Sequence, residues 1–115
     1  MMVDPEKVVY GITTGFGSFA NVSISPEQRS QLQINLIRSH AVGVGQPIPI
    51  TTARKMLILR INTLSKGRSG VKPETLQKLV AAYNGNFIPR IPCQGTVGAS
   101  GDLAPLSHLA LGLMG

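Results

Sequence analysis

The stretch from Gly95 to His108, GTVGASGDLAPLSH, combines residues whose types and spacing could support chemistry. Gly95, Gly98 and Gly101 recur at every third position, and a glycine-rich loop that precedes a helix can bind an anion. The stretch lacks the lysine of a Walker loop and the spacing of a dinucleotide-binding fingerprint, so it is a weak nucleotide signal. An ordinary tight turn also explains the glycines, because glycine adopts backbone conformations that other residues avoid.

The tripeptide Ala99-Ser100-Gly101 allows a second interpretation, in which the backbone itself becomes reactive. If the chain bends sharply, the amide nitrogen of Gly101 can attack the carbonyl carbon of Ala99, and small side chains leave that approach open. Loss of one water from the ring and one from the Ser100 side chain leaves an exocyclic methylidene, which is an electrophile. Asp102 follows, where the start of a helix favours a carboxylate. Ala-Ser-Gly is a common tripeptide, so spacing alone favours the tight turn.

Longer stretches of the chain favour the chemical interpretation. GTVGASGDLAPLSHLAL (95–111) closely resembles the signature of the aromatic amino acid ammonia-lyases, the histidine and phenylalanine ammonia-lyase family. VYGITTGFG (9–17) resembles the first motif of this family, and NLIRSHAVGVGQPI (35–48) resembles the helix that lines the substrate side chain. LRINTLSKGRSGV (59–71) is similar to the segment that comes next. The resemblance therefore covers nearly the whole chain from Val8 onward.

The resemblance implies a mainly α fold, the N-terminal part of a large helical lyase fold. It implies that Ala99, Ser100 and Gly101 cyclise autocatalytically to a methylidene-imidazolone, a cofactor derived from the protein without a metal. The family's catalytic base would be Tyr10, although a buried tyrosine elsewhere is usually a core residue with a satisfied hydroxyl. The implied reaction removes the β-proton and ammonia from an aromatic amino acid and leaves a trans-unsaturated acid.

Ser39 and His40 occupy the positions that look like the family's selectivity switch. Phenylalanine-specific members carry Phe-Leu there and tyrosine-specific members carry His-Leu, whereas Ser-His is the pattern of the histidine enzymes. An imidazole substrate needs a polar partner, and a site built to hydrogen-bond its substrate rejects an analogue that leaves this partner unpaired. The resemblance therefore implies that L-histidine is converted to trans-urocanate, as in histidine catabolism. A phenylalanine or tyrosine ammonia-lyase or aminomutase is the alternative within the family.

Glycines and prolines divide the chain into a short extended, turn-rich segment (8–24) and about four helices. Ser25 as N-cap, Pro26 in the first turn and Gln28 in a capping box predict the first helix, which would stop at Gly43. The second helix would run from Thr51 or Thr52 to Gly67, the third from Pro73 to Gly85, and the fourth from a start within 102–105. In the first helix, Leu32, Leu36 and Ile37 would face inward. The apolar residues along the second helix are Met56, Leu57, Ile61 and Leu64, and the third carries Leu76, Leu79, Val80 and Tyr83.

The composition excludes several classes of protein. The 115 residues carry a formal charge of +6, but the basic residues are scattered, so a solvated surface is favoured over a nucleic-acid-binding helical module. Cys93 is alone, which excludes an intrachain disulfide and suits a reducing compartment. No signal peptide or apolar stretch of membrane-spanning length is present, so a cytoplasmic location is expected.

His108 lies within the apolar run LAPLSHLALGLMG (103–115), where a lone histidine is more often a hydrogen-bonded core residue than a catalyst. No metal-ligand partner stands at helical spacing from it, so no metal is predicted. A helix that is apolar all round belongs inside a larger body. We therefore expect residues 1–115 to be a single N-terminal segment of a larger ammonia-lyase domain, inactive alone.

The family resemblance implies that the remaining active-site groups lie beyond Gly115, and that the full-length enzyme is a homotetramer whose sites draw on three chains. A truncated, inactive homologue that serves as an assembly partner is a further alternative.

Overall fold

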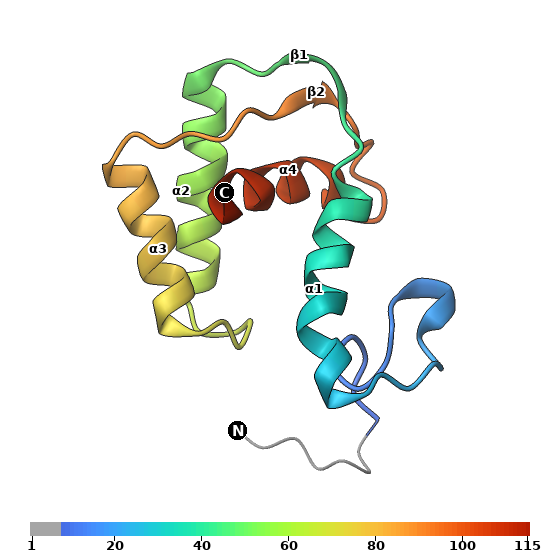
Figure 1. Ribbon diagram of the computed structural model, residues 1–115. Coiled ribbons are helices and arrows are strands. Elements are labelled where there is room, and N and C mark those ends of the chain that lie inside the picture. Colours follow the sequence, from blue (N-terminus) through green and yellow to red (C-terminus); the bar gives the residue numbers. More distant parts are fainter. Residues whose placement is uncertain (1–7) are drawn as a thin grey trace. The chain divides into compact units, whose positions relative to one another are not determined.

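Four α-helices follow one another within residues 8–115, as the positions of the glycines and prolines predict (Figure 1). The computed structural model describes residues 8–115. The chain divides into two units, Met1–Leu36 and Ile37–Gly115. The expected mainly α fold is confirmed, and a small two-stranded sheet accompanies the helices.

Residues 8–24 in the first unit form turns around a short 3₁₀ helix, η1 (Gly17–Phe19). An isolated antiparallel bridge joins Thr14 to Ser23, and the Ile24 N–H donates to the Thr13 carbonyl over 2.9 Å. The Thr13 hydroxyl accepts a hydrogen bond from the Val9 N–H over 2.8 Å, so a buried polar side chain organises the turn. The predicted turn-rich segment is confirmed.

Helix α1 (Pro26–His40) begins where the sequence predicts, with Ser25 before it and the proline in its first turn. A hydrogen bond with the Ser25 side chain lowers the pKa of the Glu27 carboxyl, and the Glu27 backbone N–H and the charge of Arg29 act in the same direction. The helix ends at His40 rather than at Gly43. The expected inward residues Leu32, Leu36 and Ile37 are half-buried, and α1 contains no buried residue.

The segment after α1 forms strand β1 (Val44–Pro47), which pairs antiparallel with β2 (Pro92–Gln94) in the second unit (Figure 1). Val44 lies opposite Gln94 and Pro47 opposite Pro92, with an irregularity between these pairs. The Ile48 N–H donates to the Ile91 carbonyl over 2.9 Å and extends the contact. Prolines restrict strand pairing because they lack an N–H donor, and both strands are accordingly short.

Helices α2 (Ile50–Ser65) and α3 (Pro73–Asn84) lie against each other in the second unit. Helix α2 begins one or two residues before the predicted threonines, because Pro49 occupies the N-cap position. Gly67 adopts φ +70° just after the helix, a left-handed conformation that glycine accepts without strain. The Arg54 guanidinium lies 4.4 Å from the centre of the Tyr83 ring and joins the two helices.

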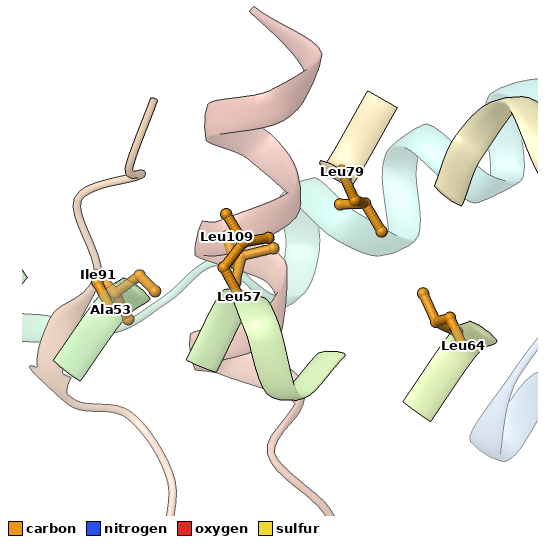
Figure 2. Packing of buried hydrophobic residues seen from close by; sticks show 6 residues of the cluster. All are labelled: Ala53, Leu57, Leu64, Leu79, Ile91 and Leu109. Carbon is orange, nitrogen blue, oxygen red and sulfur yellow. The ribbon is translucent and has the colours of Figure 1, made fainter. Parts of the chain in front are cut away.

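The core of the second unit is small and draws on α2, α3, α4 (Leu103–Met114) and the residue before β2. Figure 2 shows the Leu57 and Leu109 side chains against each other and Ile91 beside Ala53. Among the residues that the structure describes, Leu57 and Ile91 are the largest fully buried side chains. The buried hydrophobic cluster consists of Ala53, Leu57, Leu64, Leu79, Ile91 and Leu109.

The apolar side chains that the sequence places on α3 are buried to different degrees. Val80 is 38% exposed, although it falls on the apolar stripe of its helix. Leu79 is buried and its neighbours along the face, Leu76 and Tyr83, are half-buried against the core cluster. The apolar stripe along the α3 sequence is therefore wider than the face of the helix that packs against the described residues.

The apolar fourth helix is confirmed as α4, which begins at Leu103 directly after the glycine loop. Its buried residues are Ala104, Ser107 and Leu109, while Leu103 and Met114 at its two ends are exposed. None of the helices formed by residues 8–115 combines the length and hydropathy that crossing a bilayer requires.

Candidate active site

The loop between β2 and α4 carries the tripeptide Ala99-Ser100-Gly101 at the surface of the second unit. Gly98, directly before the tripeptide, adopts φ +73°, and Gly101, its last residue, adopts φ +101°. No heavy atom lies within 4 Å of where a Cβ on either glycine would stand, so these glycines serve the backbone conformation rather than a close contact. The loop is therefore bent at the tripeptide, with open space around it.

The Thr96 side chain organises this loop from within. Its hydroxyl accepts a hydrogen bond from the Gly98 N–H over 3.0 Å. The same hydroxyl lies 3.3 Å from the Gly101 carbonyl oxygen and 3.3 Å from Asp102 Oδ1, to either of which it can donate its proton. The Thr96 hydroxyl thus contacts both sides of the tripeptide. Sequence reasoning missed this residue, although a hydroxyl two residues before a glycine is a turn signal.

Asp102 stands at the N-cap position of α4, as expected from the helix start. Its side chain makes no capping hydrogen bond to the helix and instead accepts from the Thr96 hydroxyl, while its carbonyl accepts the Leu106 N–H over 3.2 Å. The carboxylate lies near the positive end of the helix dipole, which favours its charge. Asp102 therefore ties the end of the loop to α4.

These features fit a methylidene-imidazolone formed from Ala99, Ser100 and Gly101. Ring closure requires a sharp bend at Ser100, which stands between two glycines with positive φ, and Gly101 brings no side chain beside its reacting nitrogen. Ala99 and Ser100 are both exposed. The same bend is consistent with an unmodified tight turn.

Ser39 and His40 lie in the last turn of α1, within the second unit. The Ser39 hydroxyl oxygen stands 3.0 Å from His40 Nδ1, so a hydrogen bond joins the pair, with the donor set by the imidazole tautomer. His40 is half-buried and Ser39 is exposed. The bond to Nδ1 orients the ring and directs Nε2 away from the serine.

Tyr10 lies in the first unit, whereas the other predicted site residues lie in the second. Its ring is 62% exposed and packs edge-on against Phe16, with ring centres 5.6 Å apart. The phenolic oxygen accepts a hydrogen bond from the Gly17 N–H over 3.1 Å. A Cβ on Gly11 would stand 2.5 Å from a carbon of the Phe16 ring, so the glycine after Tyr10 is required for this packing. Tyr10 is thus a positioned surface tyrosine rather than a buried core residue.

A pocket of about 480 Å³ opens beside the loop, between α2, β2 and the start of α4. Thr96 and Asp102 line it from the loop, Arg60 from α2 and Cys93 from β2. Its wall combines apolar side chains with a few polar groups, as in many small-molecule sites. The tripeptide itself is not among its lining residues.

His108 is half-buried on α4, and its Nε2 accepts a hydrogen bond from the Gly43 N–H over 2.9 Å. This agrees with its interpretation as a hydrogen-bonded residue of the packed interior. Within residues 8–115, no group of three or more histidine, cysteine, aspartate or glutamate side chains is placed to hold a metal ion.

Comparison with known proteins relates the chain to one family. The family model described as aromatic amino acid lyase matches residues 1–115. The histidine ammonia-lyase of Halalkalibacterium halodurans is 58% identical over 114 residues, which are 99% of this chain and 22% of that protein. The chain therefore spans about a fifth of the length of this curated relative.

Solved structures give the same relationship. The histidine ammonia-lyase of Trypanosoma cruzi matches with a TM-score of 0.76 and 53% identity, over 90% of this chain and 19% of that one. The phenylalanine aminomutase of Pantoea agglomerans matches with a TM-score of 0.85 and 39% identity, over 92% of this chain and 20% of that one. Because the family model matches the chain along its full length, the chain belongs to the aromatic amino acid lyase family.

Proposed function

We propose that this chain supplies part of the active site of a histidine ammonia-lyase, an enzyme that eliminates ammonia from L-histidine to give trans-urocanate. The observation that carries the proposal is the Ser39–His40 pair, which stands at the end of α1 in a chain that matches the family model throughout. Relatives named histidine ammonia-lyase, 58% identical in one case, support the same substrate.

The proposal assigns the electrophile to the loop. Ala99, Ser100 and Gly101 would form the methylidene-imidazolone, which supplies an electron-accepting group that the twenty standard side chains lack. Thr96 holds the loop on both sides of the tripeptide through its hydroxyl, and Asp102 anchors its end to α4. These contacts restrict the loop before cyclisation, which lowers the entropy cost of closing the ring.

The remaining roles fall on α1 and the first unit. We assign substrate binding to Ser39 and His40, whose side chains are joined by a hydrogen bond between the serine hydroxyl and Nδ1 of the imidazole. We assign removal of the β-proton to Tyr10, whose phenolic oxygen is held by the Gly17 N–H. A positioned general base of this kind contributes about 10²- to 10⁴-fold to a rate.

Two further proposals concern the complete enzyme. Residues 1–115 would act as a single N-terminal segment of a larger ammonia-lyase domain, since they span 22% of the Halalkalibacterium halodurans relative. The complete enzyme would be a cytoplasmic homotetramer of histidine catabolism, as the family resemblance implies.

A phenylalanine or tyrosine ammonia-lyase or aminomutase is the second candidate. The likeness to the Pantoea agglomerans phenylalanine aminomutase supports it at the level of the fold. The higher sequence identity to the Trypanosoma cruzi histidine ammonia-lyase, 53% against 39%, favours histidine.

A chimera tests the proposal. This chain replaces the matching 114 residues of the Halalkalibacterium halodurans protein, and the purified chimera is assayed for urocanate from L-histidine and for cinnamate from L-phenylalanine. Intact mass is measured in parallel, because cyclisation removes two waters from the sequence mass. We expect urocanate, no cinnamate, and the reduced mass. Cinnamate as the main product would favour the second candidate.

Two variants of the chimera separate the electrophile from the base. Ser100→Ala cannot form the methylidene, so we expect the reduced mass to disappear and turnover to fall more than about a thousandfold. Tyr10→Phe should keep the reduced mass and lower turnover about 10²- to 10⁴-fold. Normal turnover by Ser100→Ala would exclude the cofactor, and failure of Tyr10→Phe to cyclise would show that Tyr10 has another role.

A further inference from the structure

Three segments of the second unit meet at two glycines. Gly43 comes three residues after His40, and Gly95 is the first residue of the loop that carries the tripeptide. A Cβ on Gly95 would stand 3.1 Å from the Cα of Gly43 and 3.1 Å from the Cβ of Ala104 on α4. A Cβ on Gly43 would stand 3.2 Å from the Gln94 carbonyl oxygen. The backbones after α1 and after β2 therefore touch, and no side chain fits between them.

His108 holds this contact from the side of α4. Its Nε2 accepts the Gly43 N–H over 2.9 Å, and a Cβ on Gly43 would stand 3.0 Å from the same nitrogen. An imidazole nitrogen that accepts an N–H must be unprotonated, so the neutral ring carries its proton on Nδ1. The bond joins residues 65 positions apart and connects the segment after α1 directly to α4.

The geometry links the two halves of the proposed site. Helix α4 starts immediately after the loop. Through His108, the same helix is hydrogen-bonded to the segment that follows Ser39 and His40. A displacement of about 1 Å in a substrate-positioning group can cost about a hundredfold in rate. A fixed contact between Gly43, Gly95 and His108 would prevent such a displacement.

We propose that His108 is a positioning residue, which sets the place of the Ser39–His40 pair relative to the Ala99-Ser100-Gly101 loop through its hydrogen bond to Gly43. This inference rests on the proposed function. His108 itself does not bind substrate or take part in proton transfer. Its effect is on how well the histidine imidazole is held while the loop reacts.

The test uses the chimera and two substitutions of His108. His108→Leu removes the acceptor and leaves the Gly43 N–H unpaired, and we expect the KM for L-histidine to rise about tenfold. His108→Gln offers a carbonyl oxygen at a similar reach, and we expect it to restore the KM to within about threefold of the parent. Both variants should show the mass reduced by two waters, because the loop's own hydrogen bonds are intact.

A control removes a hydrogen bond of similar kind away from the junction. Ser65→Ala deletes the bond from the Ser65 hydroxyl to the Asn62 carbonyl at the end of α2, 2.9 Å long, and should leave the KM unchanged. If His108→Leu is insoluble, Gly43→Ala disturbs the same bond from the other side, because its new Cβ meets His108 Nε2. The same rise in KM is expected.

The outcomes distinguish failure of the proposed function from failure of the role proposed for His108. If the unsubstituted chimera forms no urocanate, the proposed function is wrong and the role of His108 falls with it. If that chimera is active and the loss of the acceptor leaves the KM for histidine at the parental value, His108 does not position the pair. Equal effects of leucine and glutamine at this position would likewise overturn the proposal, because only glutamine keeps an acceptor.

Discussion

The Thr96 hydroxyl contacts the backbone on both sides of the Ala99-Ser100-Gly101 tripeptide. It accepts a hydrogen bond from the Gly98 N–H over 3.0 Å. It lies 3.3 Å from both the Gly101 carbonyl oxygen and a carboxylate oxygen of Asp102, to either of which it can donate. The tripeptide between these contacts is exposed, and its flanking glycines have positive φ. The loop therefore owes its bend to a few local hydrogen bonds rather than to burial.

Replacing this hydroxyl should slow cyclisation. Thr96→Val keeps the shape of the side chain but removes the acceptor for Gly98 and the donor for the far side of the loop, and we expect cyclisation about tenfold slower. Thr96→Ser keeps the hydroxyl and should cyclise at nearly the parental rate. Intact mass of the chimera, followed over time after synthesis, measures the cyclised fraction. An unchanged time course for the valine variant would show that Thr96 does not shape the loop.

Ser39 and His40 give a prediction about substrate choice. A polar pair matches an imidazole substrate and leaves a phenyl substrate with an unpaired polar partner in the site. His40→Leu should lower kcat/KM for histidine by about tenfold or more, and Ser39→Phe combined with His40→Leu should move activity toward phenylalanine. Urocanate and cinnamate formation by the chimera measure both changes. Unchanged histidine turnover after the single substitution would exclude His40 as a substrate contact.

At the scale of helices and strands, the prolines and glycines at helix ends predict the helices well. Pro26 and Pro73 lie in the first turns of α1 and α3, and Gly67 and Gly85 follow α2 and α3, as the sequence predicts. The pairing of β1 with β2 escapes such reasoning, because the two strands are far apart in sequence and contain prolines. Their partnership depends on the packing of α2 and α4 around Ile91, which no local pattern encodes.

In the candidate site, too, some features can be predicted from the sequence and others depend on the fold. A continuous motif identifies Ala99, Ser100 and Gly101, so the sequence suffices to predict the tripeptide. The contacts of Thr96 and the bond between Gly43 and His108 depend on how the loop closes and on which segments meet. Sequence spacing alone contains neither piece of information.

Helix α2 contributes several residues to the core of the second unit, and its packing predicts which substitutions destabilise the chain. Leu57 is fully buried against Leu109, whereas Leu59 on the same helix is 63% exposed. Leu57→Ala should cost about 2–5 kcal/mol, a large share of the stability of a small domain. We expect the 115-residue chain to lose most of its helical circular dichroism signal with this change. The matched Leu59→Ala should retain it, and equal losses in both variants would show that Leu57 is no core residue.

At the scale of the whole molecule, the second unit combines a small core with a large apolar groove. The groove has a volume of about 1030 Å³ and lies between α2, α3 and α4, where Leu64, Leu79, Phe87 and Leu113 contribute to its walls. An exposed apolar surface of this size marks a place where another part of a protein or a partner binds. The chain spans only 22% of the Halalkalibacterium halodurans relative, so in a protein of that length the remaining part would be available to cover the groove.

The groove predicts different behaviour for the chain alone and for the chimera. Because a short chain buries a smaller fraction of its surface, the isolated 115 residues should unfold over a broad range of urea and bind a hydrophobic dye such as ANS before unfolding. The chimera should bind little dye in its native state, since the rest of the protein covers the groove. Circular dichroism and dye fluorescence along the same titration measure both properties. A monomeric isolated chain with a sharp transition and no dye binding would mean that residues 1–115 form a complete domain, and the proposed larger ammonia-lyase domain would then be wrong.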